Sequence, residues 1–243
     1  MEIITRKLRE GKDGIEGYIA HPSREETGPG LLLIHQHSGL TGYLKTAAYK
    51  FAQLGYCTVV PNLYHMLGYP AETHIDKGTE IQNKTPDGDF VRVIDKGWKY
   101  LRSRSDVENS RVGVIGYCMG GRIGIHFVAS SPDVRAFVAY YPSVRNEGPS
   151  NIRPRHPCDA AREIKCPSMV LYGGHDNTST FDVQQRVMDS FFANGQELEW
   201  HFFGFGNHGF ASTESGGYQP HLAELVWPLV VDFLSGKLNA AKQ

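Results

Sequence analysis

One segment near the middle of the chain restricts the fold more than any other. An apolar run, Val112–Cys118, leads into Gly116-Tyr-Cys118-Met-Gly120, and a helical pattern follows over residues 122–129. Two glycines that flank a single residue at this spacing fit a sharp turn between a strand and a helix, because larger side chains would clash with the closely approaching backbone. The segment therefore predicts a strand–turn–helix unit with Cys118 at its tip.

Apolar runs and helical patterns alternate after residue 30, which is typical of strand–helix units joined into a parallel sheet. The expected core strands are Leu31–His35, Cys57–Leu63, Val112–Cys118, Ala136–Tyr141, Ser168–Gly173 and Glu199–Phe203. Most are short and rich in branched or aromatic residues, as strands covered on both faces should be. We expect one α/β domain over residues 1–243, with a mainly parallel central sheet flanked by helices on both faces.

Four longer helices are predicted from apolar periodicity and from end signals. They cover Tyr43–Leu54, a segment that begins at Thr85-Pro86-Asp87 with proline in the first position, Val183–Phe191 ended by Asn194-Gly195, and Leu222–Phe233 with a kink near Pro228. The first 20 residues predict a short antiparallel lead-in around Gly11–Gly14. Residues Ser143–Pro157 predict a long surface loop.

Composition excludes several classes of partner. The 25 basic and 26 acidic residues give a formal net charge of -1, so no strong field favours nucleic acid or an anionic membrane. No apolar run reaches the roughly 20 residues of a membrane-spanning helix, and no signal peptide is recognisable, so a cytoplasmic monomer or homodimer is expected. Four cysteines without Cys-x-x-Cys pairs are expected to be free thiols.

The predicted turn gives Cys118 the features of a nucleophile. It is the strand–turn–helix arrangement called a nucleophile elbow, with cysteine in place of serine. The helix N-terminus that follows would stabilise a thiolate through its N–H groups and its dipole. The competing interpretation is a buried cysteine that fills space, which is the rule for isolated cysteines. The strand, both glycines and the helix favour the nucleophile.

A cysteine nucleophile in this fold needs an acid and a histidine, in that chain order, from loops at the carboxyl ends of later strands. Asp176 follows a strand that ends in Gly-Gly, and His208 lies in a glycine-rich loop after the last strand. His208 would accept the thiol proton while Asp176 orients the imidazole. His175 and His201 are the alternatives to His208, and Asp182 is the alternative to Asp176.

Acyl chemistry also needs backbone N–H donors for an oxyanion. One is expected from Met119, the residue after the cysteine, and one from His37, in the turn after the strand Leu31–His35. The side chain of His37 is then incidental and free to face solvent. No cofactor is expected, and His35, His37, His65 and His74 lack the spacing of known metal ligands.

With these residues assembled, the chain resembles the dienelactone hydrolase family, also called carboxymethylenebutenolidases, within the α/β-hydrolase fold. The resemblance spans nearly the whole chain. It rests on Gly-Tyr-Cys-Met-Gly-Gly (116–121), Pro61-Asn-Leu-Tyr64, Ala139-Tyr-Tyr141, Gly173-Gly-His-Asp176, and Asn207-His-Gly-Phe-Ala211 with Ser215-Gly-Gly-Tyr218 beyond. It implies a Cys118, Asp176 and His208 triad that cleaves a small ester or lactone through a thioester.

Two positions depart from the family pattern. The family usually has a glutamate that holds the cysteine where this chain has Gln36, and a neutral amide cannot accept a proton at ordinary pH. We therefore expect His208 alone to ionise Cys118. Where the family has a carboxylate-binding arginine four residues after the histidine, this chain has Ser212. A neutral substrate is expected, unless an arginine of the long loop folds over the site (Arg145, Arg153 or Arg155).

Several further side chains are expected near the substrate. Gln36, Tyr64, Tyr140 and Ser212 are the candidate binding residues, and His65, Met66, Tyr141 and Phe210 could also line the pocket, with core packing as the alternative. Two other functions fit the same residues. One is attack on a different electrophile, namely a phosphotriester, a carbon–halogen bond or an acyl-transfer partner. The other is a non-catalytic homologue that binds a small ligand.

Overall fold

The computed structural model describes residues 1–70, 75–193, 195 and 197–239 of the 243-residue chain. Its centre is one eight-stranded sheet with the order β1-β2-β4-β3-β5-β6-β7-β8. The strands are β1 (Ile3–Leu8), β2 (Gly17–Pro22), β3 (Gly28–Ile34), β4 (Cys57–Pro61), β5 (Val107–Tyr117), β6 (Ala136–Tyr140), β7 (Ser168–His175) and β8 (Leu198–Asn207).

Parallel pairing brings the functional segments to one edge of the sheet. β1 and β2 pair antiparallel, and so do β2 and β4, whereas the pairs from β4 to β8 are parallel. Ile34 at the end of β3 pairs with Gly116 of β5, and Tyr117 pairs with Tyr140 of β6. The loops after β3, β5, β6, β7 and β8 therefore leave the sheet at the same edge.

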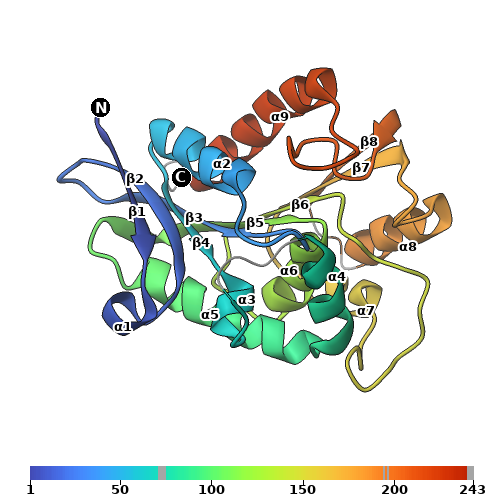
Figure 1. The fold of residues 1–243 in the computed structure, drawn as a ribbon. Coiled ribbons are helices and arrows are strands. Elements are labelled where there is room, and N and C mark those ends of the chain that lie inside the picture. The colour runs from blue at the N-terminus through green and yellow to red at the C-terminus, as the bar shows by residue number, and fades with distance from the viewer. Residues whose placement is uncertain (71–74, 194, 196, 240–243) are drawn as a thin grey trace.

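Helices cover both faces of the sheet (Figure 1). α2 and α9 lie on one face, and α5 and α6 lie on the other. The helices are α1 (Glu10–Asp13), α2 (Gly42–Gln53), α3 (Leu63–Met66), α4 (Ile75–Lys84), α5 (Asp87–Arg102), α6 (Met119–Ala129), α7 (Pro157–Ala161), α8 (Phe181–Phe192) and α9 (Pro220–Leu238). Within the described residues, none of these helices is long and apolar enough to cross a membrane.

The core follows the expected burial. Every residue of β3, β4 and β6 is buried, because helices cover both faces of these central strands. A buried ion pair joins the two helices on the α5–α6 face: the guanidinium of Arg122 donates two hydrogen bonds to Asp87, at 2.7 and 2.8 Å. This bidentate contact ties the helix that follows Cys118 to its neighbour.

The α/β-hydrolase fold predicted from the sequence is confirmed, and so are the six core strands and the lead-in hairpin. Several predicted element boundaries differ from the observed ones, and two of these differences have a local structural reason. Pro86 takes the cap position rather than the first helical position of α5, and the N–H of Asp87 donates to the carbonyl of Ile152. Leu63 begins the short helix α3 rather than ending β4. The predicted stop at Asn194 lies outside the described residues.

Candidate active site

Cys118 lies in a strained turn between β5 and α6. Its backbone angles are φ 52° and ψ −113°, a conformation that side-chain-bearing residues rarely adopt. A Cβ atom on Gly116 would lie 2.3 Å from the carbonyl oxygen of Gly120, and one on Gly120 would lie 2.2 Å from that of Ile34. Both glycines are therefore required by close backbone contact, as the sequence predicts.

His208 and Asp176 lie in line with the sulfur. Nε2 of His208 is 3.0 Å from Sγ of Cys118, and Nδ1 of the same ring is 2.8 Å from Oδ2 of Asp176. The other carboxylate oxygen, Oδ1, accepts hydrogen bonds from the N–H groups of Thr178 and Ser179. The carboxylate is thus fixed by its own loop while it orients the imidazole.

The loops that carry these residues are tied to each other. The hydroxyl of Ser179 lies 2.9 and 2.7 Å from the carbonyl oxygens of Pro142 and Val144 in the loop after β6. That loop also donates the N–H of Ser143 to the carbonyl of Cys118. The segments after β5, β6 and β7 therefore hold one another in place at the sheet edge.

The electrostatics favour an ion pair between sulfur and imidazole. Burial by itself disfavours the Cys118 thiolate, but the charge and hydrogen bond of His208, with smaller contributions from His37, outweigh it and lower the pKa of the thiol to about 5. Burial likewise disfavours the imidazolium of His208, but Cys118 and Asp176 outweigh it and raise its pKa to about 10. Near neutral pH the pair is a thiolate that accepts a hydrogen bond from an imidazolium.

Two backbone N–H groups beside the sulfur are free to bind an oxyanion. Among the residues described here, neither the N–H of His37 nor that of Met119 donates a hydrogen bond within the protein. The carbonyl of Gln36, in the same trans peptide unit as the His37 N–H, accepts from Nδ1 of His35 at 2.7 Å and from the N–H of Gly39 at 3.0 Å. These bonds fix the direction of the His37 N–H.

His35 is a neutral, fully buried residue that supports this turn through hydrogen bonds. Burial lowers the pKa of its imidazole to about 4, so the ring is uncharged near neutral pH. Nδ1–H donates to the carbonyl of Gln36, and Nε2 accepts from the N–H of Leu63 at 3.1 Å. The hydroxyl of Tyr64 adds a hydrogen bond of 2.6 Å to the carbonyl of His37. The tyrosine proposed as a binding residue is thus a buried support of the turn.

Gln36 and Ser212, the two departures from the family pattern, contact each other. The side-chain amide of Gln36 donates to the hydroxyls of Ser38 (2.8 Å) and Ser212 (3.2 Å). Ser212 has no exposed surface, and Gln36 is only 4% exposed. Gln36 and Ser212 thus occupy the positions at which the family usually has glutamate and arginine, and a neutral hydrogen bond joins them.

The side chain of His37 approaches the sulfur, whereas the expectation from sequence left it free to face solvent. Its Nδ1 lies 3.9 Å from Sγ of Cys118, on a ring that is only partly exposed. The remaining alternatives lie elsewhere. His175 and Asp182 are exposed, and His201 is 3.5 Å from Glu199 on β8. None of these three replaces His208 or Asp176 beside the sulfur.

Aromatic side chains pack next to the candidate triad. The ring of Tyr141 is 5.3 Å from that of His208 and 5.1 Å from that of Phe210, and Tyr140 stacks on Tyr117 at 4.8 Å. Tyr140, Tyr141 and Phe210 are buried, whereas His65 and Met66 are partly exposed. These aromatic rings form an apolar wall beside the imidazole.

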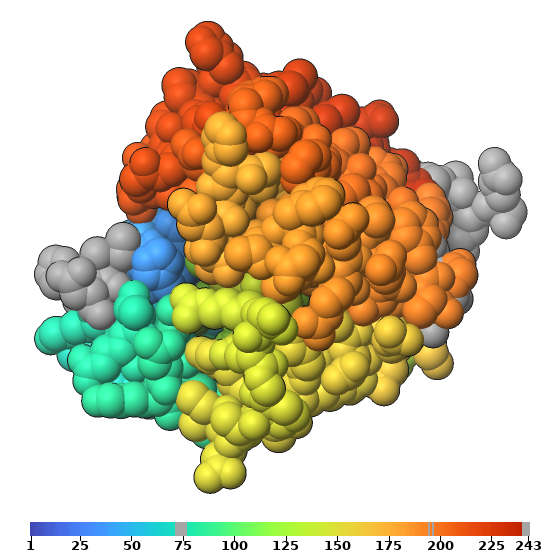
Figure 2. Space-filling model, turned by 90° about the vertical axis from the view of Figure 1, so that its right-hand side faces the viewer, coloured from blue at the N-terminus to red at the C-terminus, as the bar shows by residue number. Residues whose placement is uncertain are grey.

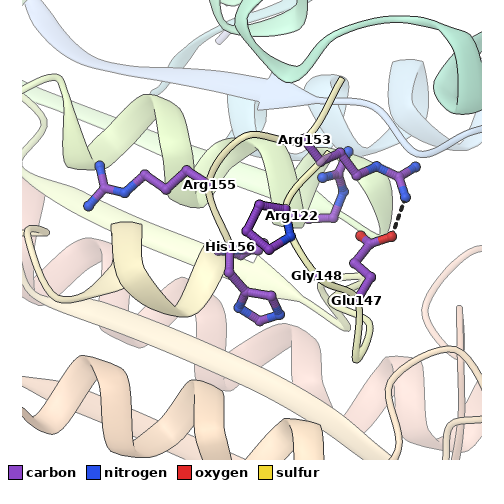
Figure 3. Close-up of a pocket in the computed structure, with 8 residues that line it drawn as sticks. Arg122, Glu147, Gly148, Arg153, Arg155 and His156 are labelled. Carbon is purple, nitrogen blue, oxygen red and sulfur yellow. Dashed lines mark hydrogen bonds and ion pairs between the residues drawn. The ribbon is translucent and has the colours of Figure 1, made fainter. Parts of the chain in front are cut away.

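Two of the three arginines of the long loop are engaged in ion pairs of their own, whereas Arg145 is exposed. Arg153 pairs with Glu147 and Arg155 with Glu163. Figure 3 shows Arg153 and Glu147 around a small cavity next to Arg122, with Arg155 pointing away from them. Cys118 does not line this cavity. Figure 2 shows the loop, in yellow, on the surface beside the orange residues of α8.

All four cysteines are free, and within the described ranges no group of three or more His, Cys, Asp or Glu side chains is placed to hold a metal ion. His74, one of the histidines considered as a metal ligand, lies outside the described residues.

An eight-stranded, mainly parallel sheet with a strained elbow at its carboxyl edge defines an α/β-hydrolase, a class that solved structures bear out. A Klebsiella pneumoniae protein provisionally named a dienelactone hydrolase superposes with a TM-score of 0.87 at 24% identity, covering 97% of this chain and 99% of that one. A promiscuous dienelactone hydrolase-like phosphotriesterase from metagenomic libraries gives 0.80 at 17% identity, covering 98% and 99%.

Sequence comparison identifies the family within this class. The model of the dienelactone hydrolase family matches residues 15–238, and the chain belongs to this family. A protein of Methylorubrum extorquens, provisionally named a carboxymethylenebutenolidase, is 27% identical over 225 residues, which cover 91% of this chain and 77% of the relative. The chain is accordingly a hydrolase that acts on a lactone or an ester.

Proposed function

We propose that the protein hydrolyses a small ester or lactone with Cys118 as nucleophile, His208 as general acid and base, and Asp176 as the residue that orients His208. One observation carries the proposal: Sγ of Cys118 lies 3.0 Å from an imidazole whose other nitrogen is 2.8 Å from a buried carboxylate. Nucleophile, base and orienting group at these distances are the requirement for covalent acyl transfer.

The reaction then runs in two steps. The thiolate attacks the carbonyl carbon, and the N–H groups of His37 and Met119 stabilise the oxyanion. The imidazolium of His208 protonates the departing alkoxide as the carbon–oxygen bond breaks, which leaves a thioester on Cys118. Neutral His208 next takes a proton from water, whose oxygen attacks the thioester. Release of the carboxylic acid restores the thiolate and the imidazolium.

The preferred substrate is neutral in this proposal. Ser212 offers no charge and is already bonded to Gln36, while Arg153 and Arg155 are paired with glutamates. An anionic acyl group would lose hydration beside the thiolate without gaining an arginine.

A panel of neutral aryl esters, neutral lactones and one anionic dienelactone tests both the proposed nucleophile and the proposed neutral substrate. The wild type should turn over the neutral compounds faster, and the intact mass after rapid quenching should show one acyl group on Cys118. Cys118→Ser should lose most turnover, because a hydroxyl is far harder to ionise than a thiol, with little change in the unfolding midpoint.

Four results would count against the proposal. Undiminished turnover in Cys118→Ser would show that Cys118 is not the nucleophile. Strong preference for the anionic lactone would contradict the proposed neutral substrate. A phosphotriester in the same panel tests the alternative electrophile, which one structural neighbour carries in its name. If only the phosphotriester were hydrolysed, phosphotriester cleavage would replace acyl transfer as the proposed reaction. Tight ligand binding without turnover or acylation would favour the non-catalytic homologue.

A further inference from the structure

Two imidazoles, not one, flank the sulfur of Cys118. His208 approaches from the loop after β8 with Nε2 at 3.0 Å, and His37 approaches from the turn after β3 with Nδ1 at 3.9 Å. The mechanism above uses the whole side chain of His208 but only the backbone N–H of His37. The imidazole of His37 therefore has a position at the reacting atom without an assigned role.

No other described side chain is placed to do what His37 can do. The amide of Gln36 has two hydrogens, and both are directed to serine hydroxyls, Ser38 and Ser212. Within the described part of the chain, the two imidazoles are the hydrogen-bond partners of the sulfur. The side-chain amide of Gln36 therefore has no hydrogen left to donate to the sulfur of Cys118.

The remaining ionisable groups around the sulfur are phenols that stay neutral. Tyr64 on α3, Tyr141 in the loop after β6 and Tyr172 on β7 interact with it electrostatically, and burial raises the pKa of each well above its usual range. Asp176 acts through His208. Charge at the sulfur is therefore controlled by Cys118 and the two imidazoles.

We propose that the side chain of His37 is a second catalytic imidazole, which donates its Nδ1–H to the thiolate of Cys118 and stabilises it independently of His208. The assignment rests on the proposed function, in which this thiolate is the nucleophile. The side chain of His37 needs no proton transfer to act: it faces a charged sulfur before attack, an uncharged one in the thioester, and a charged one again after hydrolysis. His37 thereby replaces the family's glutamate by another means, since it stabilises the thiolate instead of accepting the thiol proton.

Side chain and backbone of residue 37 can be tested separately. The main chain of the turn is held by Tyr64 and by the two hydrogen bonds to the carbonyl of Gln36. A substitution at His37 leaves those bonds and the backbone N–H in place. Because the side chain is partly exposed, its loss should also cost little stability.

The test compares His37→Leu with His37→Asn. The side-chain nitrogen of asparagine is attached to Cγ, as Nδ1 of histidine is, and can donate in its place, whereas leucine has a similar branched shape and no donor. The readout is the ultraviolet absorbance of the thiolate against pH, with Cys118→Ser as the blank. We expect the ionisation midpoint of Cys118 to rise by about one pH unit in His37→Leu, a roughly tenfold loss of thiolate at acid pH. His37→Asn should recover most of this shift.

Two results would overturn the assignment: an unchanged midpoint in His37→Leu, or an equal rise in both variants, which would indicate lost packing. If His37→Leu fails to fold, nuclear magnetic resonance of the unmutated protein decides. The imidazole ¹⁵N signals of His37 should shift when Cys118 is alkylated with iodoacetamide, and unaltered signals would exclude the contact. Neither readout uses an ester. Failure of the proposed function, seen as turnover that survives Cys118→Ser, is therefore a separate outcome.

Discussion

The backbone of Cys118 is held in a costly conformation for a non-glycine residue. A conformation of this kind costs on the order of 1–3 kcal/mol. Three hydrogen bonds hold it: the N–H of Cys118 donates to the carbonyl of Tyr140, and its own carbonyl accepts from Arg122 and Ser143. The strain lies at the residue that presents the sulfur to His208, which links the local geometry directly to the proposed chemistry.

Asp176→Asn isolates the role of the carboxylate. Its Oδ1 can still accept the N–H groups of Thr178 and Ser179, so the loop should keep its shape, but the amide nitrogen would face Nδ1–H of His208. The imidazole then loses its orienting acceptor. We expect kcat to fall by about 10³–10⁴-fold with KM nearly unchanged. A steady-state assay beside a thermal unfolding scan measures both effects, and a loss below tenfold would argue against the orienting role.

The pH profile follows from the two shifted groups. Below about pH 5 the sulfur of Cys118 is protonated and a poor nucleophile, so kcat/KM should rise once as the pH increases through this value. Above about pH 10 His208 loses the proton that it gives to the leaving group, and kcat/KM should fall. Because Gln36 cannot ionise, no second acid limb is expected. A second ascending limb, beside that of Cys118, that persists in Asp176→Asn would contradict this.

At this scale, sequence reasoning finds residues with strong local patterns. Cys118 is marked by its flanking glycines, and His208 and Asp176 by their order after it. It does not find the direction of a side chain in a loop. The position of His37 beside the sulfur depends on how the turn after β3 is supported by His35 and by Tyr64. The hydrogen bonds by which His35 and Tyr64 support this turn join residues up to 28 positions apart and leave no periodic signal.

Among the elements, the turn from β5 into α6 depends on small residues. Gly120 packs against the carbonyl of Ile34, just before the turn that carries the His37 N–H. Gly120→Ala should therefore push two parts of the site apart, destabilise the fold by about 3 kcal/mol, and abolish turnover. Gly148→Ala is the matched control, because its Cβ would meet nothing within 4 Å. Urea unfolding of both variants, with an ester assay, checks this, and equal stability of the two would refute it.

Element prediction succeeded where one face of a segment is continuously apolar. The central strands and the helices α2, α5, α8 and α9 are long enough for a clear period. The short helices α3 and α7 span four and five residues, too few for a periodic pattern, and each is stabilised by tertiary contacts. The helix α4 gives a weak signal for a different reason: most of its residues are polar or charged, so its sequence shows no continuous apolar face.

In the whole molecule, the candidate site draws on the centre and one side of the sheet. The residues of the proposed triad follow β5, β7 and β8, and the turn that carries the His37 N–H follows β3, whereas β1 and β2 form the opposite edge. β1 is mostly exposed or half-buried, and its one ladder is with β2. Stability and function should therefore be distributed unequally across the sheet.

Hydrogen exchange under mild denaturation separates these regions. Amides of β1 should exchange at urea concentrations well below the unfolding midpoint, since this edge strand buries few side chains and can open locally. Ester hydrolysis should persist there, because no residue of the proposed site lies on β1. β8 is also an edge strand, but its end carries His208, so activity should be lost when amides of β8 begin to exchange. Mass spectrometry of peptides from β1 and β8, sampled beside an activity assay, follows both events. If activity were lost at the urea concentration at which amides of β1 exchange, before those of β8 do, the site would be coupled to the antiparallel edge.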